Sequence, residues 1–572
     1  MKRASRLAQT LLRSKTNQIR ASQTFKRTYS TPLASNVSSD GMVRCAFPDV
    51  ELRNVPLPHL MLDAFSKHGD NVALVDHMSG RQYTFNQLTM AVTRVASAFA
   101  KSGVKQGDAV TLFSPNCPEF LIAFLAVNAC GGVASAVNPL YTPGELVHAV
   151  KEANSSLIIT IPLLVPVVNK AREELPGVKG VITFGEAEGC RPFADLMADD
   201  GTAFPENVDI SPEKDIVALP FSSGTTGLPK GVMLTHHNLV SNILQMTSPG
   251  VVNYTGDDVS LGVLPFFHIY GKTVVLLFSL FMGTKVVTLP KFEPESFLSA
   301  VQDHKVTYMF IVPPIVLFLA KHPLVDKYDF SNVKHMLTAA APVSPDIAVA
   351  AMERLKNPRM VVRQGYGMTE SSPITHVNPP DQVKLPSVGP PVPNTLSKVI
   401  DITTGRALGP NEEGEICCKG PQIMLGYLNN PESTADTVDA DGWLHSGDLG
   451  YYDEEGYFYV TDRLKELIKH KGYQVAPAEL ETLLLRHPEV MDVAVIGVPD
   501  DRAGELPRAY VKAKPNSKLS EEDLVQFIKG QVANYKELTG GVEFKDEIPK
   551  SAAGKILRRI LKDDYMQKQA MK

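Results

Sequence analysis

One short loop of the chain has the sequence Ser222-Ser223-Gly224-Thr225-Thr226-Gly227-Leu228-Pro229-Lys230-Gly231. It follows the apolar run 216–219, which predicts a buried strand. Glycine lets the main chain approach a ligand closely. Amide groups, hydroxyls and the Lys230 ammonium can therefore all point at phosphate oxygens. The stretch predicts a polyphosphate-binding loop at the end of a strand in an α/β fold.

Two other interpretations of this loop are weaker. A Walker A loop has Gly-Lys followed by Ser or Thr, whereas the order here is Pro229-Lys230-Gly231. A solvated Ser/Thr/Gly linker is the second alternative, but linkers seldom lie between two apolar stretches. We therefore expect a phosphate loop of another kind.

Composition and length favour an ordinary globular protein that handles small molecules. The chain has 572 residues, enough for two to four domains, with 44% hydrophobic and 21% charged residues. Its formal charge of -5 provides no basic field for nucleic acid. The longest apolar run, Thr273–Thr284, is shorter than the ~20 residues of a bilayer span. We expect this run to be a core strand or helix, and we expect no transmembrane segment.

The six cysteines show no spacing typical of a disulfide framework or a metal site. There is no CxxC pair and no histidine spacing that suits zinc. We therefore interpret them as reduced packing residues in a reducing compartment. They are Cys45, Cys117, Cys130, Cys190, Cys417 and Cys418.

Residues 1–39 have the composition of a mitochondrial presequence. They hold eight Lys or Arg residues and many Ser and Thr, and the first acidic residue is Asp40. Residues 27–30 resemble a matrix-protease site with cleavage after Tyr29. The pattern predicts a matrix protein; the alternative is a disordered basic tail on a cytosolic protein. The C-terminal Ala570-Met571-Lys572 is not the Ser-Lys-Leu peroxisomal signal.

Strand and helix patterns alternate along most of the chain, which predicts α/β layers with largely parallel sheets. The expected strands include Val72–Asp76 and Lys334–Thr338. The charged segment 462–471 predicts a connection to a small α+β domain that begins with a helix at 477–485. The predicted organisation is a presequence at 1–39, a large domain at 40–464 and a C-terminal domain at 465–572.

The loop resembles the phosphate loop of the adenylate-forming superfamily, which includes acyl-CoA synthetases, 4-coumarate-CoA ligases and luciferases. Further stretches resemble motifs of that family in the family's order, so that the similarity spans roughly residues 56–561. They are Pro265–Gly271, Gln364–Glu370, Trp443–Asp448, Asp462-Arg463 and Pro549–Arg559. The resemblance implies the adenylate-forming fold, with a large N-terminal domain of layered sheets flanked by helices and a small, mobile C-terminal domain.

The nucleotide site follows from this resemblance. In the turn Gly365-Tyr366-Gly367, the tyrosine would stack on adenine. Thr369 would contact the α-phosphate and Glu370 would bind Mg²⁺, which prefers hard oxygen ligands. The ribose hydroxyls would be held by Asp448, with Arg463 donating nearby.

The same resemblance assigns the acid pocket. His268 and Tyr270 would line it near the reacting carboxylate. The family segment usually written Ser-Gly-Ala-Ala-Pro is Thr338-Ala339-Ala340-Ala341-Pro342 in this chain. The methyl group of Ala339 replaces a glycine hydrogen and would narrow the pocket, which disfavours a bulky aromatic acid such as a coumarate.

The C-terminal domain would present one face to the active site during adenylation and a different face during thioester formation. Lys555 matches the family's catalytic lysine, which would bridge the carboxylate and the α-phosphate. Lys469 and Gln474 match residues that hold the adenylate. Lys471 and Gly472 match the pantetheine tunnel. Because Lys555 and Gly472 would serve different steps, we expect a swivel about a hinge at Lys465.

The resemblance implies an ATP-dependent acid-CoA ligase whose partners are a fatty or aryl carboxylic acid, ATP with Mg²⁺, and coenzyme A. A luciferase-like adenylating oxygenase and a non-catalytic acyl or nucleotide binder remain as alternatives. The segment 414–420 resembles the second signature box of 4-coumarate-CoA ligases, in which Cys417 is usual. We interpret this cysteine as a packing residue.

Overall fold

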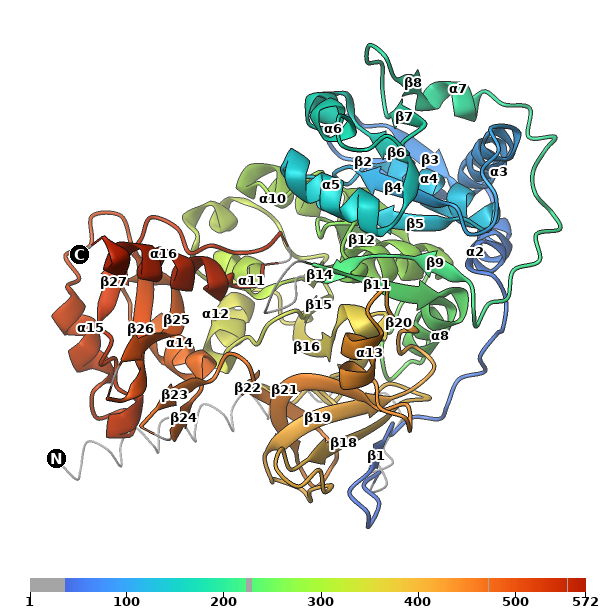
Figure 1. Cartoon of the computed structure of the whole chain (residues 1–572). Coiled ribbons are helices and arrows are strands. Elements are labelled where there is room, and N and C mark those ends of the chain that lie inside the picture. The colour runs from blue at the N-terminus through green and yellow to red at the C-terminus, as the bar shows by residue number, and fades with distance from the viewer. Residues whose placement is uncertain (1–35, 223–228, 472, 501, 553, 572) are drawn as a thin grey trace. The chain divides into compact units, whose positions relative to one another are not determined.

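A computed structural model describes residues 36–571 apart from 223–228, 472, 501 and 553. The predicted α/β fold class is confirmed, and the strands lie in four sheets (Figure 1). The predicted strand at Val72–Asp76 is found with the same bounds, because four apolar residues, two of them β-branched, lead to Asp76 and a turn. The domain boundaries at 39/40 and 464/465 stay predictions.

The first sheet carries the phosphate loop at its edge, and we call it the phosphate-loop sheet. Its middle strands are parallel and its loop-bearing edge is antiparallel. In sheet order the strands are β10 (Phe221–Ser222), β11 (Lys230–Thr235), β9 (Ile216–Ala218), β5 (Val133–Ala136), β4 (Ala109–Phe113), β6 (Ser155–Thr160), β7 (Gly180–Thr183) and β8 (Arg191–Pro192), with β20 (Gly426–Tyr427) paired to β11.

The second α/β sheet carries the predicted nucleotide motif. It is parallel except at its two edge strands. In sheet order its strands are β17 (Ile374–Val377), β16 (Val361–Gly367), β15 (His335–Thr338), β14 (Tyr308–Ile311), β12 (Val259–Gly262), β13 (Lys285–Thr288), β2 (Val72–Asp76) and β3 (Gln82–Thr84).

Two smaller sheets follow in the second half of the chain. The antiparallel sheet contains β1 (Val43–Arg44), β18 (Leu396–Ile400), β19 (Gly414–Lys419), β21 (Leu444–Tyr452) and β22 (Phe458–Arg463). Its last two strands form an antiparallel hairpin, and Gly456 with φ 77° lies in the turn between them. The C-terminal sheet contains β24 (Tyr473–Val475), β23 (Ile468–His470), β26 (Gly504–Ala513), β25 (Val490–Asp500) and β27 (Val542–Phe544).

Helices connect and cover the sheets, and several begin with a capping box in which Thr or Ser bonds the first turn, as at Thr84, Thr142 and Ser520. The α-helices of the large domain are α2 (Leu57–Ser66), α3 (Phe85–Lys101), α4 (Pro118–Ala129), α5 (Pro143–Glu152), α6 (Val165–Arg172), α7 (Phe193–Met197), α8 (His236–Met246), α9 (Ser279–Phe281), α10 (Pro294–Asp303), α11 (Pro313–Lys321), α12 (Pro345–Leu355) and α13 (Pro431–Thr437). Those of the C-terminal part are α14 (Pro477–Leu485), α15 (Glu521–Ile528) and α16 (Arg558–Ala570). The π-helix η2 spans Tyr270–Phe278, and short 3₁₀ turns are η1 (Pro162–Leu164), η3 (Pro323–Lys327), η4 (Thr369–Ser371) and η5 (Asn534–Lys536).

One hydrophobic core unites the two large sheets. It contains residues of β4 and β13 together with α4, a helix that is apolar all round and buried at every residue. Helices α5 and α6 pack on the other side of the phosphate-loop sheet, beside β6 (Figure 1). The C-terminal sheet has an apolar core of its own, around Val495 and Leu524. The predicted site residues therefore lie at or near the ends of strands that are packed into these cores.

Helix α11 contacts the C-terminal part through polar groups. The Lys321 ammonium donates hydrogen bonds to the main-chain oxygens of Leu485 (3.4 Å) and Val490 (3.0 Å). Beside it, Arg486 and Asp346 form an exposed ion pair of 2.9 Å. Both contacts involve the end of α14, where helix carbonyls lack partners within the helix.

The sequence predicts a strand or a helix for the apolar run Thr273–Thr284, and this run is helical over residues 273–281 and ends in a turn. It continues from η2 into α9 and is buried almost throughout. In the described part of the chain, no helix combines the length and the apolar character that a membrane crossing requires.

The π-helix carries a buried cation. Lys272 is fully buried, and its ammonium has no hydrogen-bond partner within the described residues. It lies over the Phe124 ring, 5.3 Å from the centroid. Burial lowers the pKa of this lysine from 10.5 to about 7.

Replacing Lys272 with Met should raise the free energy of unfolding. The folded state holds the proton only below pH about 7, whereas the unfolded chain keeps it up to about 10.5, so wild-type stability should rise with pH across that interval. At roughly 1.4 kcal/mol per pKa unit, the advantage of Lys272→Met should amount to a few kcal/mol at pH 7 and vanish toward pH 10.5. Urea unfolding at pH 7 and pH 9.5 measures it. The exposed Lys179→Met is the control, and equal effects of the two variants would contradict the expectation.

Candidate active site

The two ends of the predicted phosphate loop are held side by side. Ser222 on β10 and Lys230 on β11 are cross-strand partners. The Lys230 ammonium donates a hydrogen bond to the Ser433 hydroxyl (2.8 Å) and lies 5.0 Å from the centroid of the Tyr427 ring. It is thereby fixed at the base of the loop. The predicted ligands Ser223, Gly224, Thr225, Thr226 and Gly227 lie outside the described residues.

Tyr427 connects this lysine to the predicted metal ligand. Its hydroxyl donates a hydrogen bond to Glu370 Oε1 (2.7 Å), while its ring faces the Lys230 ammonium. Thr369 and Glu370 are both half-buried in the turn η4 after β16. Sequence analysis missed Tyr427, because a single tyrosine on a two-residue strand has no pattern that distinguishes it.

The donor set around Glu370 fits Mg²⁺. This cation is commonly held by one or two carboxylates together with substrate phosphates and water. One Glu370 oxygen accepts the Tyr427 hydroxyl, and the other accepts no hydrogen bond from any residue that the structure describes. A carboxylate oxygen therefore remains available to a cation, which would offset negative charge on the phosphates.

The predicted nucleotide and ribose motifs meet at Asp448. Its carboxylate is almost fully buried, with 5% of the side chain exposed. Arg463 Nε donates to one oxygen (2.6 Å) and the Tyr366 hydroxyl donates to the other (2.7 Å). Each carboxylate oxygen has a further lone pair that a ribose hydroxyl could use. The roles of Tyr366 on adenine and Asp448 on ribose stay predictions.

Glycine is required where β16 ends. A Cβ atom on Gly367 would lie 1.8 Å from the main-chain oxygen of Pro373, so no side chain fits there. The neighbouring Gly365 has no such restriction, because the nearest atom to its Cβ position is 3.4 Å away. The tight turn at Gly367 brings η4, and with it Glu370, back beside the sheet.

Lys555 lies within electrostatic reach of the Asp448–Arg463 pair. It is half-buried, and its main-chain amide donates to the Ser551 hydroxyl (3.1 Å). Burial lowers its pKa to about 8, and the nearby charge of Arg463 adds to this effect. The loop is docked, because a Cβ atom on Gly554 would come within 3.1 Å of Val312 and 3.3 Å of Pro314.

Arg558 anchors the segment that follows Lys555. The guanidinium is half-buried and pairs with Glu466, in the turn after β22, and with both oxygens of Glu481 on α14 (2.8 Å each). Buried charges of this kind need partners. Sequence analysis missed this cluster because its three members come from separate segments.

The predicted acid-pocket residues are only partly brought together. His268 and Thr369 line one small cavity of about 20 Å³, room for a single water. Burial, together with the Lys272 and Lys555 charges, lowers the His268 pKa to about 4, so the ring is neutral at physiological pH. Tyr270 does not line this cavity, and its hydroxyl donates to the main-chain oxygen of Leu337 (3.0 Å).

The alanines of the predicted acid pocket lie just beyond Leu337, where β15 ends. Neither Ala339 nor Ala340 lines the small cavity. Ala340 has φ 74°, in the left-handed region that residues with a Cβ rarely adopt. Strain of this kind persists only where the surrounding structure enforces it.

Three of the predicted adenylate and pantetheine residues, Lys469, Lys471 and Gln474, lie on the β23–β24 hairpin. Lys469 and Gln474 are cross-strand partners with exposed side chains, and Lys471 occupies the turn with φ 51°. Gly472 lies outside the described residues. Lys465, the predicted hinge, is exposed in the turn between β22 and β23. No hydrogen bond or ion pair in the described part of the chain joins the side chains of Lys469 and Gln474 to the predicted catalytic lysine.

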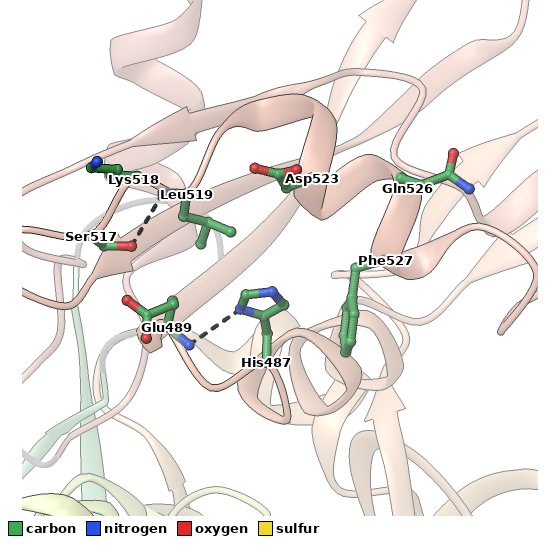
Figure 2. A pocket seen from close by; sticks show the side chains of 8 residues that line it. All are labelled: His487, Glu489, Ser517, Lys518, Leu519, Asp523, Gln526 and Phe527. Carbon is green, nitrogen blue, oxygen red and sulfur yellow. Dashed lines mark hydrogen bonds between the residues drawn. The ribbon is translucent and has the colours of Figure 1, made fainter.

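A larger hollow of about 600 Å³ lies in the C-terminal domain and contains no predicted site residue. Figure 2 shows His487 in this hollow between Glu489 and Phe527. The ring accepts a hydrogen bond from the Glu489 amide (3.2 Å) and packs edge-on against Phe527, 5.0 Å between centroids. His487 thus has its contacts within the hollow itself. The volume of a hollow is therefore not enough to identify the active site.

Comparison with known proteins shows which proteins this chain is similar to. The AMP-binding enzyme family model matches residues 62–428, and the AMP-binding enzyme C-terminal domain model matches residues 479–555. The chain is 42% identical over 533 residues to a probable 4-coumarate-CoA ligase 1 of Dictyostelium discoideum, covering 90% of this chain and 96% of the relative. ATP-bound MatB from Rhodopseudomonas palustris superposes with TM-score 0.78 at 29% identity, covering 88% of this chain and 99% of that one. The anthranilate CoA ligase AuaEII, in complex with anthranoyl-AMP, has TM-score 0.80 at 25% identity, with coverage of 91% and 98%.

Replacing Tyr427 with Phe should raise the magnesium concentration needed for half-maximal pyrophosphate release. The ring that faces Lys230 is kept and only the hydrogen bond that orients Glu370 is lost, and loss of such an outer contact of a metal ligand typically weakens metal binding by roughly 10–100-fold. Pyrophosphate release at fixed ATP and varied Mg²⁺ measures it. Tyr427→Leu also removes the ring and should in addition raise KM for ATP. An unchanged magnesium dependence in Tyr427→Phe would contradict the role of the hydroxyl.

Proposed function

This chain belongs to the AMP-binding enzyme family, and on that premise we propose that it is an ATP-dependent acid-CoA ligase that converts a carboxylic acid, ATP and coenzyme A into acyl-CoA, AMP and pyrophosphate. One observation carries the proposal: Lys555, in a docked loop, lies within electrostatic reach of Arg463 and Asp448, whose charges act on its ammonium group. A half-buried cation at that place can stabilise the negative charge that develops on the reacting oxygens during adenylation.

In the first step a carboxylate oxygen of the acid attacks the α-phosphorus of ATP in line. The bond between this phosphorus and the oxygen that bridges to the β-phosphorus breaks, and pyrophosphate leaves. The Lys555 ammonium can stabilise negative charge on the reacting oxygens, and Lys230 can hold the departing phosphates. No protein nucleophile is needed, because catalysis of this kind consists of positioning and charge stabilisation. Bound Mg²⁺, held by Glu370, would supply further neutralisation.

In the second step the coenzyme A thiolate attacks the carbonyl carbon of the acyl-adenylate, and the bond to the AMP oxygen breaks. Lys471 and Gly472 belong to this step. Lys471 lies in the turn of the β23–β24 hairpin, which makes no hydrogen bond to Lys555 in the described residues. A swivel about Lys465 would exchange the two faces between steps.

We propose an acid of the fatty or aryl class, activated in the mitochondrial matrix. Relatives named for coumarate and anthranilate support an aryl acid. Ala339 in place of glycine supports a slimmer acid than coumarate. The basic, acid-free composition of residues 1–39 supports import. Organelle fractionation, with N-terminal sequencing for cleavage after Tyr29, tests the location.

Mass spectrometry of products tests the reaction. The purified chain, begun at Ser30, receives Mg-ATP, coenzyme A and a panel of short, medium, long-chain and aromatic acids. Acyl-CoA with AMP confirms the ligase and names its acid class. Acyl-adenylate without thioester would point to another acceptor or to an oxygenase, and the absence of any product would favour a non-catalytic binder.

Lys555→Ala should separate the two steps. Adenylation should fall by ~10² or more, the effect of removing one electrostatic stabiliser, while thioester formation from supplied acyl-adenylate should continue near the wild-type rate. Pyrophosphate release and acyl-CoA formation measure the two steps separately. Equal loss of both would overturn the assignment of Lys555 to the first step.

The pH profile of adenylation should also report Lys555. The ammonium form prevails below its pKa of about 8, so kcat/KM for adenylation should decline as pH rises through that value. Lys555→Arg keeps its charge and should show a lower rate without the alkaline decline. A decline of equal size at the same pH in this variant would assign the titration to another group.

A further inference from the structure

Three side chains of different ligand types converge on the antiparallel sheet, outside the site described above. Glu415 and Cys417 lie two residues apart on β19 and so share one face of the strand. His445 on β21 is the cross-strand partner of Cys417. Their ligand atoms all lie within 4.8 Å of one another, and no other His, Cys, Asp or Glu trio in the described residues does so.

The distances match a shared cation. His445 Nδ1 is 3.6 Å from Cys417 Sγ and 3.0 Å from Glu415 Oε2. A tetrahedral zinc ion, with Zn–S ~2.3 Å and Zn–N ~2.0–2.1 Å, holds its sulfur and nitrogen ligands ~3.6 Å apart. The sulfur–nitrogen pair therefore already has the separation that the metal requires.

The outer contacts follow the pattern of metal-binding histidines. The second ring nitrogen of His445 lies 3.4 Å from Asp439 Oδ2, and such a carboxylate fixes the tautomer that leaves Nδ1 free for a metal. The thiol of Cys417 is fully buried, beside Ile400 and Trp443. Glu415, His445 and Asp439 are 13%, 28% and 35% exposed at their side chains, which leaves a path for entry from solvent.

We propose that Glu415, Cys417 and His445 form a binding site for a divalent cation of the zinc type. One sulfur, one imidazole nitrogen and one carboxylate oxygen are ligands that zinc and cobalt accept, and water completes the fourth position. The metal displaces the thiol proton to solvent. Magnesium, which prefers oxygen ligands throughout, does not fit.

The site would stabilise the start of the Asp448 turn. The second oxygen of Glu415 accepts a hydrogen bond from the Gly447 amide (2.9 Å), one residue before Asp448. Since the metal would use the other oxygen, this hydrogen bond is kept. A bound cation would join β19 to β21 at this point, without taking part in the proposed reaction.

Cobalt absorption tests the site directly. The full chain, freed of metal with a chelator, is titrated with Co²⁺, which absorbs strongly when bound by a thiolate. Wild type should develop this absorption at one equivalent and lose it when Zn²⁺ is added, and Zn²⁺ should raise the melting temperature. Cys417→Ser should show neither effect. Cys418→Ser is the matched control, because that buried thiol contacts Ser397 (3.6 Å) instead, and it should behave as wild type.

A second variant covers the case in which Cys417→Ser does not fold. Glu415→Gln keeps the thiol and an acceptor for Gly447 but weakens one ligand, and it should bind Co²⁺ at least tenfold less tightly. Absence of thiolate–cobalt absorption in wild type would overturn the proposal. So would full absorption in folded Cys417→Ser, or wild-type affinity in Glu415→Gln.

Discussion

The buried carboxylate of Asp448 constrains the arrangement of the whole site. A charge that is almost excluded from water must be paired and hydrogen-bonded, or it destabilises the fold. Its partners come from different elements: Arg463 from the adjacent strand β22, and Tyr366 from β16 of the second α/β sheet. The antiparallel sheet is therefore joined to the second α/β sheet at this carboxylate.

The electrostatics around Asp448 explain why a lysine there is suited to phosphate chemistry. Lys555 shares its surroundings with Arg463, and this like charge, added to burial, disfavours its ammonium form. A triphosphate brings negative charge to the same place and relieves that repulsion, so the ligand and the lysine proton favour one another. The attraction between Lys555 and the triphosphate therefore acts at the atoms where charge develops during the reaction. At the other end of the phosphates, Lys230 and Glu370 would supply charges for the phosphates and the cation, and Tyr427 connects the two residues.

Much of the fold could be predicted from sequence, because short β-branched runs bounded by turns, such as Val72–Asp76, leave little choice of structure. The run Thr273–Thr284 could not be resolved between strand and helix, since an apolar segment buried on all sides has no periodicity to separate them. The motifs singled out Glu370, Asp448 and Lys555, whose roles stay predictions, and in the structure the charge of Asp448 acts on the Lys555 ammonium. Sequence could not predict the roles of Tyr427, Arg558 and the Cys417–His445 pair. Each depends on contacts with residues that are distant in the sequence and become neighbours only in the fold.

The contact between Lys321 and the end of α14 has a consequence for any change in domain arrangement. Its acceptors are the main-chain oxygens of Leu485 and Val490, which every residue type would present in the same way. Water replaces an ammonium on such carbonyls at little cost. The Lys321 contact can therefore be strengthened or weakened from the large domain alone, whereas the neighbouring ion pair between Arg486 and Asp346 depends on one side chain from each part.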